Sequence, residues 1–323
     1  MIQRLCTILL LFAVLAGLPA SGQDARVLQY QSIPMLFNPA QTGDYEGDLR
    51  VMVLYSYAKS DSGKNILTNF SIDKSFGKDG KWAVGLNYMR SGHSDFNMSG
   101  GYLGASVARA IRLDKENNHR LRVGLQVSWL SGKVDETKGA YDHLLDVNAF
   151  RYKAKTGHYK GSADYLNLGG GIKYQYVKDA VRFETGIGVN NLTHPNYLIM
   201  EEGSYSKRLR VSTSSLFQYQ FNPRNAIRLE YLSWKEGIFA RHYDPEELDV
   251  DIHESLYSIS WIRNWDDASF TAGLNSRSWK AIGALVHCRF TPEWGLGFGY
   301  EHPLLKKYYS VSRFEISATF QPF

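Results

Sequence analysis

The stretch LRVGLQVSW, residues 121–129, alternates strictly between two kinds of side chain. Its odd-numbered positions are apolar, from Leu121 to Trp129, whereas its even-numbered positions are Arg122, Gly124, Gln126 and Ser128. An alternation with a period of two predicts a β-strand with one apolar and one polar face. The same alternation recurs along most of the chain, and the apolar rows of four further segments are Trp82, Val84, Leu86 and Tyr88; Val181, Phe183, Ile187 and Val189; Trp294, Leu296, Phe298 and Tyr300; and Phe314, Ile316, Ala318 and Phe320.

Strand length and loop length separate a soluble sandwich from a membrane barrel, which the period alone does not. Many alternating segments run for about ten residues, as a tilted membrane-crossing strand requires, whereas ordinary strands have about five or six. Tight turns are expected at residues 77–79, 114–119, 178–180, 222–224, 265–267 and 291–293. Longer links are expected at residues 59–64, 92–97, 133–162, 193–204, 235–252, 275–280 and 302–309. This asymmetry predicts an all-β, transmembrane outer-membrane β-barrel of about 14 antiparallel strands, with short periplasmic turns and longer extracellular loops.

Composition excludes several other classes of protein. The 323 residues include 37 basic and 32 acidic side chains, and this balance argues against a nucleic-acid binder, which usually has a clustered basic face. Two cysteines exclude a disulfide-stapled scaffold and a four-thiolate metal site. Aromatic residues make up 14% of the chain, and aromatics favour strands. We therefore expect the lipid bilayer, and no nucleic acid, among the partners.

The N-terminus has the layout of a secretory signal peptide. Arg4 precedes an apolar run from Leu5 to Leu18, and small residues follow up to Gly22. We expect residues 1–22 to be removed, residues 23–48 to form a periplasmic segment, and residues 49–323 to form the barrel. The apolar run is shorter than the roughly 20 residues of a membrane-spanning helix. Cleavage would leave Cys288 as the single cysteine.

The sequence contains no recognisable catalytic or metal-binding pattern. It has no G-x-G-x-x-G element opening a helix, no H-E-x-x-H and no G-x-S-x-G. The acidic stretch at residues 244–254 lacks the spacing of a helix-loop-helix calcium site. We therefore predict no enzyme, no cofactor and no metal. Trapping of a Ser or His by an active-site probe would instead indicate a barrel hydrolase. Glycine rows near Gly169, Gly186 and Gly295 predict a narrow or filled lumen.

Residues 133–162 form the longest predicted loop, and it is both basic and aromatic. Tyr152, Lys153 and Lys155 are its candidates for docking a partner or contacting surface polysaccharide, since long loops often carry function. The alternative is an ordinary solvated loop.

Three short motifs resemble the PorP/SprF family of type IX secretion system outer-membrane proteins. The first follows the signal, as Gln29-Tyr30, Phe37-Asn38-Pro39-Ala40 and Gly43. The second is Phe183-Glu184-Thr185-Gly186 with Gly188, Asn191, Leu192 and Pro195, and the third is Ser312-Arg313-Phe314-Glu315-Ile316 through Phe320. The resemblance spans the mature chain.

The resemblance implies a non-enzymatic barrel of about fourteen strands in the type IX apparatus of Bacteroidota, which also serves gliding motility. Expected partners are the periplasmic ring, peptidoglycan-linked components, and the C-terminal domain of a secreted cargo protein or adhesin. Residues 23–48 are the natural contact element, with candidate partner-binding residues Tyr30, Phe37, Asn38, Pro39, Ala40 and Gly43. Two alternatives stay open: this segment is a plug that seals the barrel, or the protein is a passive porin or solute transporter.

Overall fold

The computed structural model describes residues 27–60, 63–77, 81–93, 98–135, 160–193, 196–200, 203–207, 209–241, 249–304 and 311–322. These contain one antiparallel sheet. Its strands are β1 (Leu49–Ser60), β2 (Gly63–Phe76), β3 (Trp82–His93), β4 (Met98–Arg112), β5 (His119–Asp135), β6 (Lys160–Lys178), β7 (Val181–Asn190), β8 (Asn196–Met200), β9 (Gly203–Lys207), β10 (Arg210–Asn222), β11 (Asn225–Arg241), β12 (Asp249–Asn264), β13 (Ser269–Arg277), β14 (Ala281–Arg289), β15 (Trp294–Pro303) and β16 (Ser312–Phe320).

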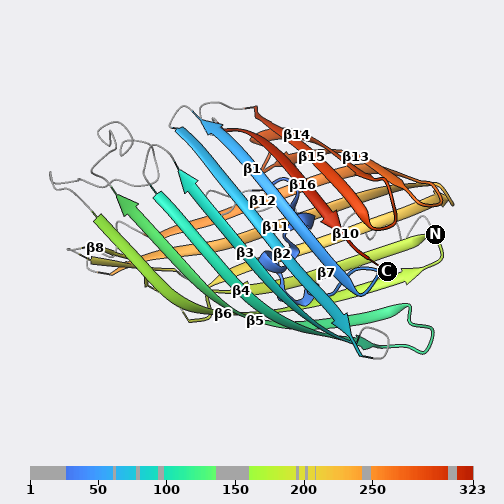
Figure 1. The fold of residues 1–323 in the computed structure, drawn as a ribbon, viewed down its shortest axis with the longest axis horizontal. Coiled ribbons are helices and arrows are strands. Elements are labelled where there is room, and N and C mark those ends of the chain that lie inside the picture. Colours follow the sequence, from blue (N-terminus) through green and yellow to red (C-terminus); the bar gives the residue numbers. More distant parts are fainter. Residues whose placement is uncertain are drawn as a thin grey trace.

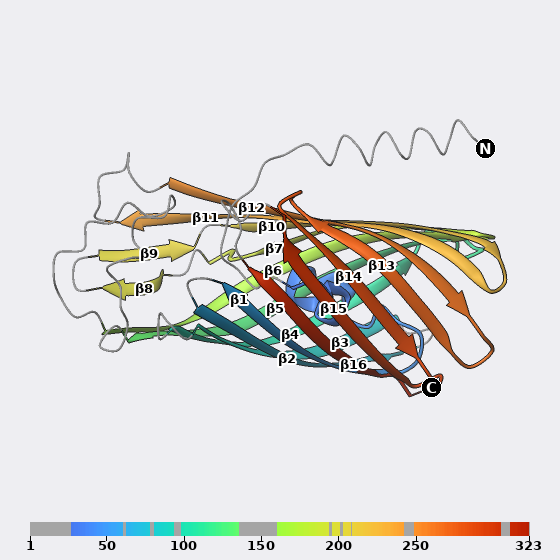
Figure 2. The same cartoon turned by 90° about the horizontal axis from the view of Figure 1, so that it is seen from above.

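Fourteen of these strands close into a barrel, as the sequence predicted. Strand β1 pairs with β16, and β10 pairs with both β7 and β11, so the sheet has no free edge around the ring. The two remaining strands, β8 and β9, form a hairpin at one end, where β9 pairs with Ile238–Arg241 of β11. Figures 1 and 2 show the tilted strands winding around a common axis.

The wall has polar residues inside and apolar residues outside. On β5, Leu125 is 63% exposed, whereas its neighbour Gln126 is 3% exposed and faces the lumen. A water-soluble protein shows the reverse arrangement, because its large apolar side chains gather in the core. The outward apolar band matches a surface that contacts lipid, and this confirms the barrel over the sandwich.

Large aromatic residues lie where the strands end at the short turns. Trp82 begins β3, Phe76 ends β2, and the rings of Trp294 and Phe320 lie 4.5 Å apart. Trp265 occupies the link between β12 and β13 and is exposed. This arrangement is one of the interfacial girdles expected of an outer-membrane barrel.

The links at the two ends of the barrel differ less in length than the sequence predicted. Lys59 pairs with Lys64 within the β1–β2 ladder, so most of the predicted loop at 59–64 is strand. Strands β5 and β6 likewise extend to Asp135 and from Lys160, inside the predicted loop 133–162. The ladders continue past the apolar band because pairing satisfies their backbone groups. The predicted links at 92–97, 133–162, 193–204, 235–252 and 302–309 each lie partly outside the described residues.

We call the end with the short links 113–118, 179–180 and 223–224 the turn end and the other the loop end. In bacterial outer-membrane barrels the short turns face the periplasm. Among the described residues, no helix is both long and apolar enough to cross a membrane. Three short helices, η1 (Tyr30–Ser32), α2 (Pro34–Phe37) and η2 (Pro39–Gln41), lie inside the barrel (Figure 1).

Candidate functional site: the plug and its contacts with the lumen wall

Residues 27–48, here called the plug, lie within the barrel and contact strands on all sides. Ile33, Met35 and Ala40 have no exposed surface at all. The sequence predicts a periplasmic segment at residues 23–48; the described part of it, residues 27–48, packs its apolar side chains within the lumen. Of the two roles left open for this segment, its geometry supports the plug.

Glycines on the lumen wall make room for the plug backbone. A Cβ atom added at Gly124 would overlap Pro39 and Ala40, and one added at Gly188 would overlap the carbonyl oxygen of Phe37. These contacts agree with the narrow or filled lumen that the glycine rows predicted. Of the three glycines named from the sequence, Gly186 adjoins the plug, whereas Gly169 and Gly295 lie against wall residues Asn190 and His287.

The Asn38-Pro39 pair shapes the middle of the plug and ties it to the wall. The Asn38 side-chain oxygen accepts a hydrogen bond from the Ala40 backbone N–H at 2.9 Å, which caps η2, and its amide donates to the Ile172 carbonyl at 3.1 Å. Asn38 is extended, as expected for a residue before proline. One motif therefore sets both a local turn and a contact with β6.

Phe37 is the aromatic centre of the plug. Its ring lies 5.5 Å from that of Trp234 on β11 and 6.5 Å from that of Tyr30, with Arg210 stacked at 5.3 Å. Phe37 is 1% exposed and Trp234 is also 1% exposed. Burying such a side chain contributes about 1.5–3 kcal/mol, so this cluster is a main source of plug affinity for the wall.

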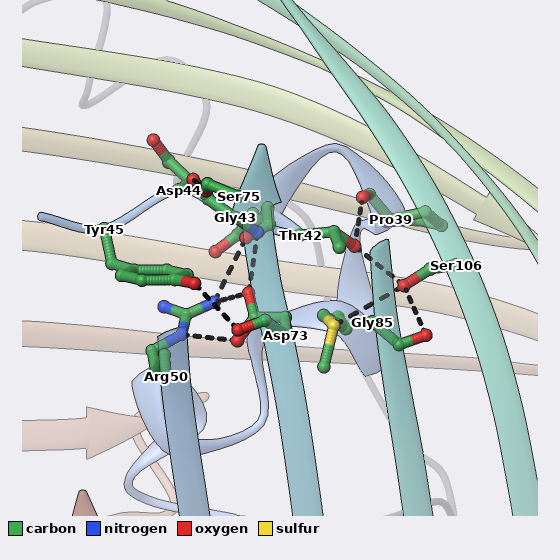
Figure 3. A network of polar contacts seen from close by, with 12 residues as sticks. Pro39, Thr42, Gly43, Asp44, Tyr45, Arg50, Asp73, Ser75, Gly85 and Ser106 are labelled. Carbon is green, nitrogen blue, oxygen red and sulfur yellow. Dashed lines mark hydrogen bonds and ion pairs between the residues drawn. The ribbon is translucent and has the colours of Figure 1, made fainter. Parts of the chain in front are cut away.

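Asp73 on β2 anchors the plug at the turn end. Its carboxylate accepts a hydrogen bond from the Gly43 backbone N–H at 2.6 Å and pairs with Arg50, at 2.7 and 3.0 Å (Figure 3). The Tyr45 hydroxyl donates to the Asp73 carbonyl at 2.7 Å. Gly43 has a φ of +69°, and a Cβ atom there would overlap Ala83, so only glycine fits this position.

A second ionic cluster surrounds Asp44. Its carboxylate pairs with Lys173 on β6, which also pairs with Glu184 on β7, while Arg122 donates to the carbonyls of Ala40 and Thr42. Burial would raise the pKa of Asp44, but Lys173 and Arg122 outweigh it and hold that pKa well below its usual range. Burial and the nearby Asp73 raise the pKa of Tyr45 to about 12, so its hydroxyl stays a donor.

The start of the plug is held by β13 and β16. The Glu315 carboxylate accepts hydrogen bonds from the backbone N–H groups of Leu28 and Gln29, at 2.9 Å, and Glu315 is 0% exposed. Arg277 donates to the Val27 carbonyl at 2.9 Å and pairs with Glu301 at 2.8 Å. The plug is therefore bound at both of its described ends.

The structure gathers the predicted residues Tyr30, Phe37, Asn38, Pro39, Ala40 and Gly43 in the plug, where they face the lumen wall. Tyr152, Lys153 and Lys155 lie outside the described residues. The partner-binding role of both groups stays a prediction.

Sequence reasoning missed the wall residues that receive the plug. These are Arg50, Asp73, Arg122, Lys173, Glu184, Arg277 and Glu315. Their signal was a charged side chain at a lumen-facing strand position. Across the residues the structure describes, no group of metal-ligating side chains occurs.

Glu184, Gly186, Gly188 and Glu315 belong to the second and third motifs quoted above, and all of them contribute to the lumen wall around the plug. Three pieces of sequence that lie far apart along the chain thus meet at one site. A closed barrel with an apolar belt, an aromatic girdle and its own N-terminal segment inside is an outer-membrane β-barrel of the plugged class.

The chain belongs to the family described as type IX secretion system membrane protein PorP/SprF, whose model matches residues 20–320. No curated protein matches the chain.

Solved structures of outer-membrane transporters share the fold. The toluene transporter TbuX of Ralstonia pickettii is 12% identical, with a TM-score of 0.54, and 94% of each chain is covered. A Pseudomonas aeruginosa FadL homologue is 12% identical, with a TM-score of 0.51, covering 88% of this chain and 92% of that one. The toluene transporter TodX of Pseudomonas putida is 11% identical, with a TM-score of 0.50, covering 94% and 95%.

Proposed function

We propose that this protein is a non-enzymatic outer-membrane component of the type IX secretion system. It acts in the secretion or surface anchoring of cargo proteins, through contacts with periplasmic ring components and with the C-terminal domain of cargo. Family membership supports the secretion system, and the turn end of the barrel presents the surface that periplasmic components would reach.

The plugged lumen is the observation that carries this proposal over a passive porin. A porin keeps a water-filled channel lined by charged side chains. Here several lumen-facing charged side chains bind the plug backbone: Asp73 binds Gly43, Glu315 binds Leu28 and Gln29, and Arg277 binds Val27. A lumen filled in this way favours contacts at the ends of the barrel over a standing water-filled channel.

The alternative is passive transport of solutes. The structural relatives named above are transporters of toluene and a FadL homologue, at 11–12% identity. At this identity the likeness concerns the fold alone. It therefore gives a reason to test conduction but identifies no substrate.

Affinity purification of the tagged protein from detergent-solubilised outer membrane tests the proposal. We expect periplasmic type IX components or a large surface protein to co-purify, as identified by mass spectrometry. A tagged outer-membrane barrel of another family, prepared in parallel, controls for proteins that bind any barrel.

Conductance in planar bilayers separates the two functions. The proposal expects little current through the wild-type barrel. A barrel that purifies alone and conducts steadily would replace the secretion role with passive transport.

A further inference from the structure

Strand pairing is interrupted at one place in the wall, at the loop end. Strand β6 pairs with β7 only from Gly170 to Lys178, whereas its residues 160–169 pair on one side alone, with β5. Beyond the ends of β7 and β10, β9 pairs with β11 and β8 pairs with β9, so β8 is the last strand of the sheet. Strands β6 and β8 lie beside each other (Figure 1), yet the two form no ladder. We call this junction between two strand edges the seam.

The backbone groups of the even-numbered residues of β6 point toward the seam. The Leu168 carbonyl accepts a hydrogen bond from the Leu192 N–H at 3.1 Å, and the Leu166 carbonyl accepts one from the Thr193 hydroxyl at 3.1 Å. Because the N–H and C=O of one residue in an antiparallel strand point to the same side, the Leu166 N–H and both backbone groups of Asp164 point to the seam as well. The link 191–193 thus covers the lower part of this edge. Residues 160–166 continue above it without a ladder partner on that side among the described strands.

The edge at residues 160–166 begins at the outer rim of the lipid-facing band. Leu166 is the cross-strand partner of Trp129, and both side chains face outward and are exposed. Asp164, two residues further along the strand toward the loop end, is also exposed. Unpaired strand edges do not occur in contact with hydrocarbon, so this edge lies where water and proteins outside the cell reach it.

The β8–β9 hairpin is joined to the rest of the wall by a short ladder. Residues Ser204–Lys207 of β9 pair with Ile238–Arg241 of β11, whereas the β10–β11 ladder beneath runs from Val211 to Asn222. A two-stranded hairpin is marginally stable by itself. Because β7 and β10 close the ring below it, the hairpin can move away from β6 without opening the barrel.

We propose that the edge of β6 at residues 160–166 takes up an extended segment of a secreted cargo protein as an added strand, in place of β8. An exposed strand edge binds an extended segment through main-chain hydrogen bonds, and alternate side chains of the segment give specificity. The edge lies at the end that faces outside the cell, where a secreted protein arrives. That the segment belongs to cargo rests on the proposed function; the capacity of the edge to add a strand does not.

The neighbouring side chains on β6 indicate which kind of segment fits. Leu166 is 67% exposed and faces outward, whereas Asn167 is 3% exposed and faces the lumen. An added strand places its side chains in the same two directions, because successive residues of a strand point to opposite faces. We therefore expect a segment that alternates between apolar residues, which lie beside Leu166, and small polar residues on the other face.

Fluorescence anisotropy tests strand addition on the full-length mature barrel in zwitterionic nanodiscs. The probe is a labelled peptide in which threonine and valine alternate between two terminal lysines. We expect saturable binding, with slower amide exchange at residues 160–166 when the peptide is bound. The same peptide N-methylated at every threonine and valine cannot donate main-chain hydrogen bonds, and it should bind at least about tenfold more weakly.

A proline in the edge removes one donor and leaves the β5–β6 ladder intact, because the N–H at this position points away from β5. Leu166→Pro should therefore bind the peptide at least about tenfold more weakly than wild type. The matched control Leu166→Ala keeps the N–H and should stay close to wild type. Asp164→Pro is a second edge variant with the same expected loss, and heat-dependent mobility on gels should show that all three variants are folded barrels.

A reversible cross-link tests the movement of the hairpin. Tyr205 on β9 and Ala240 on β11 are cross-strand partners, so the variant Tyr205→Cys/Ala240→Cys, with Cys288→Ser, allows a disulfide across this ladder. We expect the oxidised protein to lose peptide binding and the reduced protein to regain it. Equal binding in both redox states would overturn the displacement of β8. Equal binding by wild type and both proline variants, or binding of the N-methylated peptide, would overturn strand addition itself.

Photo-crosslinking in cells identifies the occupant. With benzoylphenylalanine in place of Leu166, we expect a cross-link to the C-terminal domain of a secreted protein. The control site is Leu125, which is 63% exposed on the lipid-facing side of β5 and should not cross-link to that domain. A cross-link from position 166 to a second copy of this chain alone would overturn the assignment to cargo. Peptide binding with no type IX component in the affinity purification would instead refute the proposed function and leave strand addition intact.

Discussion

Individual residues decide whether the plug fits the lumen, and Gly124 is the clearest case. Backbone atoms of Pro39 and Ala40 occupy the space that any side chain at this position would take. Backbone cannot move aside as a flexible side chain does, so the plug itself must shift. Glycine is therefore required at position 124 by the packing of the plug backbone, and not by the conformation of β5.

A Gly124→Ala substitution tests this contact. Overpacking of a buried site costs about 1–3 kcal/mol, and we expect amide exchange in residues 27–48 to become about tenfold faster, since each 1.4 kcal/mol is tenfold. Hydrogen exchange with mass spectrometry measures it. Gly170→Ala is the control, because the nearest atoms to a Cβ there lie at 3.7 Å, an ordinary contact. Unchanged plug protection in Gly124→Ala would contradict the fit.

Asp73 is the second decisive residue, because it joins the plug to a buried cation. An Asp73→Asn substitution would leave Arg50, which is 7% exposed, without its carboxylate. Removing one partner of a buried pair costs about 3–5 kcal/mol, and we expect the barrel to unfold at lower urea concentration.

Urea unfolding followed by tryptophan fluorescence measures the loss. Asp266→Asn, at an exposed turn position, is the matched control and should stay within about 0.5 kcal/mol of wild type. If both variants unfold at the same urea concentration, the anchor at Asp73 contributes nothing to the free energy of unfolding.

At the scale of elements, the plug and the strands are held together by charges. Asp44 helps to hold the plug against the wall only when its carboxyl is ionised. The pKa of that carboxyl is lowered in the folded state. This stabilisation is present above the unfolded pKa, about 3.9, and is lost as the pH falls through the lower folded value.

We therefore expect the difference in melting temperature between wild type and Asp44→Asn to be constant from about pH 8 to pH 5 and to disappear only in stronger acid. Circular dichroism of the detergent-solubilised barrel measures it. A difference that already shrinks between pH 8 and pH 6 would show that Asp44 is not ionised in the way that Lys173 and Arg122 require.

At the scale of the whole molecule, the anchors Asp73 and Glu315 hold the plug inside a single lumen. Asp73 holds the end of the plug and Glu315 holds its start, on strands that are adjacent to β1 from opposite sides. The two anchors act on opposite ends of the plug, so loss of either leaves the other in place.

We expect the double variant Asp73→Asn/Glu315→Gln to conduct ions in planar bilayers, and each single variant to conduct much less. The exposed pair Asp266→Asn/Glu116→Gln controls for the change in charge. A double variant as closed as wild type would mean that the remaining contacts, such as the Phe37 cluster and the Asp44–Lys173 pair, retain the plug.

The sequence predicted the barrel well because each strand contacts lipid with one of its faces, whichever strands it pairs with. Leu121–Trp129 must alternate wherever it pairs, since one face contacts lipid and the other the lumen, so local periodicity together with the pattern of short and long links was sufficient for the strand count. The loop boundaries were less well predicted, because ladders such as Lys59–Lys64 extend for reasons of backbone pairing that side-chain hydropathy does not record.

The plug was named as one of two alternatives for this segment, and only the tertiary structure places residues 27–48 in the lumen. The apolar residues of 27–48 fit a lumen or a partner equally well as a sequence. Only closure of the barrel brings Gly124, Asp73, Glu184 and Glu315 around them, from strands far apart along the chain. The alternation of each strand was thus determined by the sequence alone, whereas the filling of the lumen depends on complementarity between segments that meet only in the closed fold.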